Sequence, residues 1–340
     1  MIGPAFRAAS WRRRALAIAW SVAVIGFAPS APAAKPAAEK ANSPVVATVA
    51  NEPVFAAEID DLLADAPSAQ DATGEALQKL QAEALEQLIN RRAVYKTLVK
   101  QGFHPTDDDT DELLAELKQR LAMQQLDFED FLRRRSLTES LVRRRLAWDA
   151  AWTRYLEQTL TDDALEKYFA EHRREFDGTQ LRVSHILLKV ENLSDRSAVA
   201  ATVEQAERLR KDIAAGKLSF PAAAEKYSAG PSRRQGGDLG FISRHGQMAE
   251  AFSAAAFRLK KSEISPSVIT PFGVHLIQCT DVKPGRETWK SRRRELAEAW
   301  TRDHFLELAA AARKQAAVKY TGAAPHFKPG TRELVVPRAK

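Results

Sequence analysis

Two strand-like segments, each carrying one histidine, constrain the fold more than any other feature of the chain. The first covers residues 181–188 and the second residues 270–277. Side chains alternate between the two faces of a strand. Val183 and His185 therefore share one face of the first segment, and His275 and Ile277 share one face of the second. If the two strands are neighbours, the imidazoles of His185 and His275 can meet across one face of a sheet.

Between these strands lies a Gly-Gly turn, residues 236–241, followed by a short apolar stretch. Met248 and Phe252 are four residues apart, which predicts that they share one face of a helix. Together with Leu239 they could form the wall of an apolar pocket, although plain core packing explains the same residues. A single buried histidine usually only satisfies a backbone group. Two histidines on the closing strands, with Asp238 between them, favour a functional site.

The combined pattern resembles a parvulin-type peptidyl-prolyl cis–trans isomerase. The resemblance implies an α+β domain over residues 179–283, in which helices flank a small antiparallel sheet. It rests on the following segments, in this order and spacing: residues 183–187, 236–241, 246–248, Phe252 and 273–277.

The resemblance also implies roles for individual residues. His185 and His275 would be the paired catalytic histidines under the active site. Gln247 would contact the substrate backbone at the rim, and the proline pocket would be lined by Leu239, Met248 and Phe252. Rotation about a prolyl amide makes and breaks no covalent bond. No metal and no cofactor are therefore expected.

One position departs from the family pattern. Family members commonly carry an Asp, or in some a Cys, just before the Gly-Gly turn, and aligning back from Asp238 places that position at Gly230. A polar group that would face the amide is therefore absent. Two functions stay open: an isomerase that assists the folding of exported proteins and also binds clients, or a weak or inactive parvulin-fold holdase chaperone. Residues 189–197 contain no basic cluster, so phosphopeptide preference is not supported.

The flanking regions predict a second, mainly helical part. Apolar residues recur at helical spacing through residues 45–176, and the resulting stripes either pack on each other or leave a groove for unfolded clients. The flanks resemble the SurA and PrsA group of exported foldases, with a helical chaperone module before the parvulin domain. A C-terminal helix over 286–320 is expected to pack back on this module. Residues 322–340 are expected to form a disordered tail.

The N-terminus has the pattern of a secretory signal peptide over residues 1–34, followed by a linker over 35–44. Arg7 and residues 12–14 form the positive region, and residues 15–27 form an apolar segment. That segment is short for a membrane span of about 20 residues. The protein is therefore expected in the periplasm or another extracytoplasmic space. An uncleaved inner-membrane anchor is the alternative.

Charge and cysteine content narrow the classes of partner. The formal charge of +7 falls to +3 without residues 1–34, which contain four Arg and no acidic residue. This excess is too small to indicate nucleic-acid binding. Cys279 is the only cysteine, so no internal disulfide can form, and a buried core position is expected. The expected partners are unfolded or partly folded exported polypeptides with X–Pro bonds, and a membrane only if the leader is retained.

Overall fold

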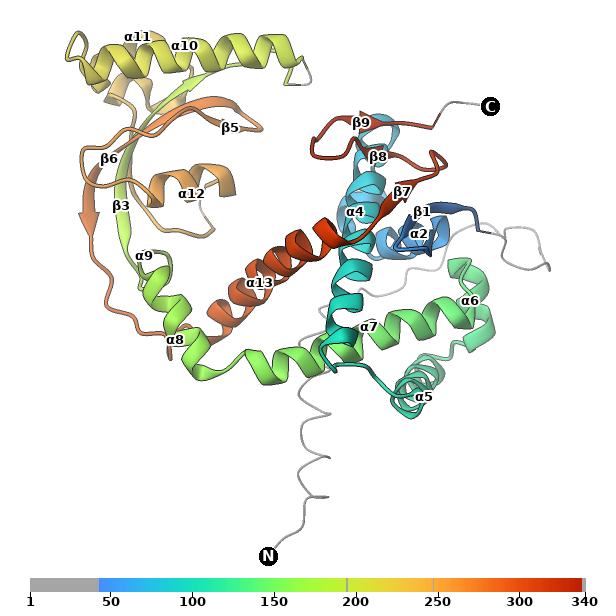
Figure 1. Ribbon diagram of the computed structural model, residues 1–340. Helices are drawn as coiled ribbons and strands as arrows, with labels where there is room; N and C mark the ends of the chain where they lie inside the picture. The colour runs from blue at the N-terminus through green and yellow to red at the C-terminus, as the bar shows by residue number, and fades with distance from the viewer. Residues whose placement is uncertain (1–42, 194, 247, 338–340) are drawn as a thin grey trace, which may run out of the picture. The chain divides into compact units, whose positions relative to one another are not determined.

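The computed structural model describes residues 43–193, 195–246 and 248–337, and divides into two units. The helical unit comprises the described residues up to Thr161 and from Thr301 onward, and the sheet unit comprises Asp162–Trp300 (Figure 1). The predicted signal peptide and nearly all of the predicted linker lie outside the described residues. Among the helices in the described ranges, none combines the length and hydrophobicity needed to span a bilayer.

Among the described residues, six helices form most of the helical unit. Thr106 is the N-cap of one of them: its hydroxyl accepts the N–H of Asp109, whose carboxylate accepts the N–H of Thr106 at 2.7 Å in a capping box. The longest helix buries Leu85, Ile89 and Leu98 completely. The six helices are α2 (Ala56–Ala64), α3 (Pro67–Gln70), α4 (Gly74–Lys100), α5 (Asp107–Met123), α6 (Phe128–Arg135) and α7 (Glu139–Thr159).

The C-terminal part of the chain returns to the helical unit through a helix and a strand. Helix α13 (Arg293–Gln315) places Phe305 edge-on to Trp148 and Trp152, with ring centroids 6.0 and 5.7 Å apart. The helix ends five residues before Tyr320, because residues 318–320 pair with β1 instead of continuing it. The three-stranded antiparallel sheet has the order β2-β1-β7 and is formed by β1 (Val45–Val49), β2 (Glu52–Phe55) and β7 (Val318–Tyr320).

Two boundaries differ from the sequence-based expectation. Strands β8 (His326–Phe327) and β9 (Leu334–Val335) pair within the segment 322–340 that was expected to be disordered. Pro329 and Gly330 form the turn between these strands, and the ring of His326 stacks on Tyr320 with centroids 4.5 Å apart. The second difference is at 162–176, which belongs to the sheet unit rather than to the helical module.

The sheet unit contains a four-stranded antiparallel sheet of order β4-β3-β6-β5, which confirms the predicted α+β fold class. The strands are β3 (Gln180–Leu188), β4 (Asp238–Ile242), β5 (Val268–Thr270) and β6 (Gly273–Lys283). The helical elements are α8 (Asp162–Glu171), α9 (Arg173–Phe176), α10 (Arg196–Ala214), α11 (Phe220–Tyr227), the 3₁₀ turn η2 (Pro231–Gln235) and α12 (Glu250–Phe257).

Helices cover both faces of this sheet, as Figure 1 shows. On the face covered by α10 and α11, Ile186 and Leu276 are fully buried. On the opposite face, covered by α12, the buried residues include Val183, Ile277 and the free thiol of Cys279. The predicted strand alternation is therefore confirmed, and it directs both histidines to the α12 face.

Candidate functional site

His185 and His275 lie side by side under helix α12. Their strands pair antiparallel with His185 opposite Ile277 and Leu187 opposite His275, so the two histidines are diagonal neighbours. The Nδ1 atoms are 3.3 Å apart, and the ring planes are inclined by only 25°. The side chains are 7% and 5% exposed. In this contact one Nδ1 carries a proton and donates the hydrogen bond, and the other Nδ1 accepts that hydrogen bond.

Thr270 extends this pair and was missed in the sequence. Its Oγ1 lies 2.8 Å from Nε2 of His275 and accepts the N–H of Phe272 at 3.1 Å. The hydroxyl can therefore donate to Nε2 while it accepts the amide, which fixes the orientation of the imidazole. The available signal was the Thr-Pro-Phe-Gly turn, because a tight hairpin brings a threonine at its start close to the histidine that follows it.

Both imidazoles are held in the neutral form. Burial lowers the pKa of His185. The pKa of His275 is lowered to about 4, first by burial and then by the neighbouring His185. A pair of uncharged imidazoles is therefore present at neutral pH, with no net charge directed toward a bound peptide.

Apolar side chains close the other side of the histidine pair. Phe252 in α12 is edge-on to both rings, with centroids 5.9 Å from His185 and 5.4 Å from His275. Leu239 and Met248 are half-buried and pack on the same cluster. Met248 precedes Ala249, the N-cap of α12, so the predicted shared helix face is wrong, although Met248 and Phe252 pack in the same apolar cluster. Gln247 lies outside the described residues.

The Gly-Gly turn supports the backbone of His185. Gly237 accepts the N–H of His185 at 2.9 Å, and a Cβ atom on Gly237 would lie 2.3 Å from the carbonyl oxygen of His185. Its φ of +83° also favours glycine. Asp238 is directed elsewhere: its carboxylate accepts from Arg182 at 2.6 Å, and this contact lowers the pKa of Asp238.

Gly230 borders the histidine pair directly. A Cβ atom at this position would lie 2.9 Å from Nε2 of His185 and 3.3 Å from Oγ of Ser228. Ser228 ties the loop to β3, since its Oγ accepts the N–H groups of Leu187 and Gly230, each at 3.1 Å. Nε2 of His185 is buried without a hydrogen-bond partner among the described residues. A side chain at position 230 would therefore contact His185 first.

No cluster of three or more His, Cys, Asp or Glu residues with the arrangement of a metal site occurs in the described part of the chain.

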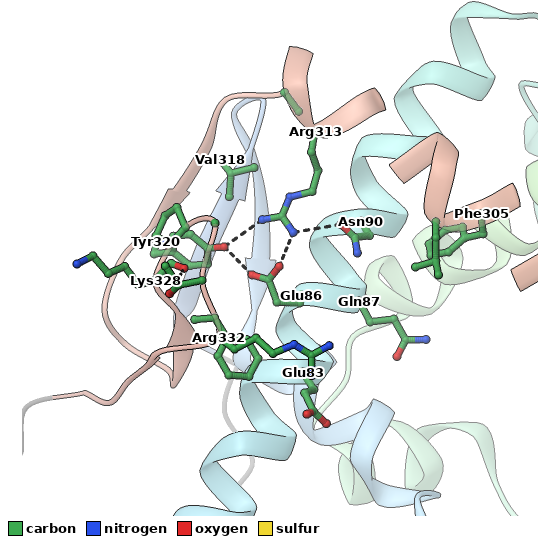
Figure 2. Close-up of a pocket in the computed structure, with 16 residues that line it drawn as sticks. Glu83, Glu86, Gln87, Asn90, Phe305, Arg313, Val318, Tyr320, Lys328 and Arg332 are labelled. Atoms are coloured by element: carbon green, nitrogen blue, oxygen red, sulfur yellow. Dashed lines mark hydrogen bonds and ion pairs between the residues drawn. The ribbon is translucent and has the colours of Figure 1, made fainter. Parts of the chain in front are cut away.

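A second candidate site is a pocket of about 930 Å³ in the helical unit (Figure 2). Glu86 is at its centre and accepts from the hydroxyl of Tyr320 at 2.6 Å and from Arg313. Burial first, and then Glu86, raises the pKa of Tyr320 to about 12. Apolar residues such as Phe305 and Leu306 complete the lining, so the pocket offers both charged and apolar surface.

Comparison with known families identifies the central part of the chain. Residues 185–281 match the model of the family described as Rotamase, PPIC-type PPIASE domain. Peptidyl-prolyl cis-trans isomerase Pin1 of Malus domestica is 38% identical over 120 residues, which cover 30% of this chain and 95% of that protein.

Longer relatives match beyond this region. Foldase protein PrsA 1 of Bacillus cereus is 30% identical over 206 residues, covering 60% of this chain and 63% of that protein. The chain thus spans less than two thirds of that foldase. Chaperone SurA of Sodalis glossinidius is 42% identical over 110 residues, covering 31% of this chain and 24% of that protein. Among solved structures, PrsA from Bacillus anthracis covers 68% of this chain and 96% of its own, with 21% identity and a TM-score of 0.38.

Proposed function

Because the chain belongs to the parvulin-type peptidyl-prolyl cis–trans isomerase family, we propose that it accelerates X–Pro isomerisation in exported polypeptides while they fold. The uncatalysed barrier is roughly 18–20 kcal/mol and arises from amide resonance. The catalyst must favour the twisted amide over the planar one, and this needs neither a nucleophile nor a cofactor.

The observation that carries this proposal is the neutral histidine pair enclosed by apolar side chains. The planar amide is more polar than the twisted amide, so water stabilises the planar form more. Phe252, Leu239 and Met248 would hold the proline ring where water is excluded. His185 and His275 would then orient hydrogen-bonding groups around the rotating bond without presenting a charge. Gln247 remains the predicted contact to the substrate backbone.

A holding function is the second candidate, and the pocket beside Glu86 favours it. Unfolded clients present apolar and charged side chains together, and this pocket offers partners for both. The relatives named foldase and chaperone support clients of this kind. The predicted leader over residues 1–34 supports an extracytoplasmic location, where such clients would be exported polypeptides.

One preparation of the full chain tests both functions. Cis–trans exchange of a short Xaa–Pro peptide is measured beside the suppression of aggregation of a reduced, unfolded protein. The isomerase proposal expects rate enhancement that is lost in His275→Ala. Suppression of aggregation without any rate enhancement would instead leave the holdase as the function.

A further inference from the structure

We propose that Arg244 is a positioning residue of the isomerase site, and that it acts by holding α12 to the short helix α9. This inference rests on the proposed isomerase function. The residues concerned form one charged chain that runs from α9 to the first turn of α12, and we call it the clasp: Glu175, Arg244 and Glu250.

The clasp is built around a buried guanidinium. Arg244 is 9% exposed, although arginine is rarely buried unless it is paired. Its Nε donates to Glu175 at 2.8 Å, and its two terminal nitrogens donate to both carboxylate oxygens of Glu250, at 3.0 and 2.6 Å. Such a bidentate contact fixes direction as well as distance. Arg244 therefore sets the position of Glu250 relative to α9.

Glu250 is the first residue of α12, and Phe252 follows in the same turn. The N-cap, Ala249, has no side chain that could cap the exposed N–H groups, so the helix start lacks that usual anchor. The loop between Arg244 and Glu250 also carries Met248. Movement of Glu250 would therefore displace the side chains of Met248 and Phe252, which pack beside the histidine pair.

Helix α9 also contacts the far end of α12. Arg174 donates to the carbonyl oxygen of Leu259, two residues after α12 ends, and the ring of Phe176 lies 5.8 Å from that of His245 in the loop before α12. Three residues of α9, Arg174, Glu175 and Phe176, thus contact the segments on either side of α12, and all three precede the family match at 185–281. The isomerase site consequently depends on a segment outside the matched domain.

The test compares Glu175→Gln with a matched control, Asp281→Asn, in the full chain. Asp281 forms an ion pair with Lys261 at 2.7 Å in the same unit, and both side chains are exposed. Glu175→Gln is expected to lower kcat/KM about tenfold, mainly by raising KM, because displaced Met248 and Phe252 side chains would bind the proline ring less well. Asp281→Asn should stay within about twofold of the wild type, as surface pairs contribute little.

Hydrogen exchange of the same proteins gives a readout independent of catalysis. Exchange over residues 248–257 should become faster in Glu175→Gln and remain unchanged in Asp281→Asn. Arg244→Lys, which keeps the charge and loses the bidentate contact, should give the same pattern if Glu175→Gln unfolds. Wild-type KM together with wild-type exchange in Glu175→Gln would overturn the clasp. A wild-type chain without isomerase activity would overturn the proposed function instead, and the exchange data would still decide the clasp.

Discussion

The two candidate sites differ in the environment and pairing of their ionisable side chains. In the sheet unit, His185 and His275 are buried, neutral and fixed by Thr270 and by the strands that carry them. In the helical unit, Glu86 and Arg313 form a partly buried ion pair in the lining of a larger pocket. The first arrangement suits one defined geometry, such as a twisted amide. The second suits varied polypeptide segments, because exposed charged and apolar groups can adapt.

The largest expected effect is a loss of stability of the sheet unit as the pH falls. The pKa of His275 is near 4 in the fold and about 6.5 in an unfolded chain, so the unfolded state binds more protons between these values. The sheet unit should therefore lose roughly 3 kcal/mol of stability as the pH falls from 6.5 to 4. Urea unfolding followed across this range measures the loss. His275→Leu should flatten the dependence, and an unchanged slope would contradict the assigned pKa.

Isomerisation should depend on a histidine of the sheet unit and not on one of the helical unit. His275→Ala is expected to reduce the isomerisation rate about a hundredfold, because the oriented polar group beside the amide is lost. His304→Ala is the matched control, since it removes the histidine that contacts Tyr155 at 2.6 Å in the helical unit. The peptide exchange assay distinguishes them. Equal losses in both variants would indicate a general effect on folding.

Position 230 tests how tightly the histidine site is packed. Gly230→Ala is expected to cost about 1–3 kcal/mol of stability, because the new Cβ forces the ring of His185 to move. Gly230→Asp adds the same Cβ with a carboxylate that can accept from Nε2 of His185. A comparison of the two variants by urea unfolding and peptide exchange isolates the carboxylate. Faster isomerisation in Gly230→Asp than in Gly230→Ala would show that the absent acid limits the rate.

The smallest expected effect concerns the pocket of the helical unit. Leu306→Ser removes an apolar side chain that lines the pocket and is 53% exposed, so stability should hardly change. Suppression of client aggregation should weaken about threefold, in line with the loss of a partly buried contact. Met123→Ser, in the same unit but outside the pocket lining, is the control. Equal suppression of aggregation by the two variants would show that the pocket does not contribute to client holding.

The sequence predicted those parts of the site that depend on local periodicity. Strand alternation placed His185 and His275 on one face, and the Gly-Gly turn was identified although the reason for it was not. Gly237 is required because it lies against the backbone of His185, and that contact is set by the fold. Thr270 was missed because its partner is defined by a hairpin rather than by spacing along one strand.

Long-range ion pairs and element ends were the least predictable features. Glu175 and Arg244 are separated by 69 positions, and no periodicity links them. Met248 was assigned to a helix because four-residue spacing carries no information about where the helix begins. The hairpin over 326–335 was assigned to disorder because proline and glycine occur both in tight turns and in flexible tails.

The pairing of β1 with β7 has a consequence for biosynthesis. Val49 near the start of the described chain pairs with Val318 near its end, whereas the sheet unit is one continuous segment between them. During vectorial emergence, the segment Asp162–Trp300 can therefore close its core while the polypeptide is still incomplete. The helical unit must wait for its last strand, so a chain that ended before β7 would retain the sheet unit and lack the completed three-stranded sheet of the helical unit.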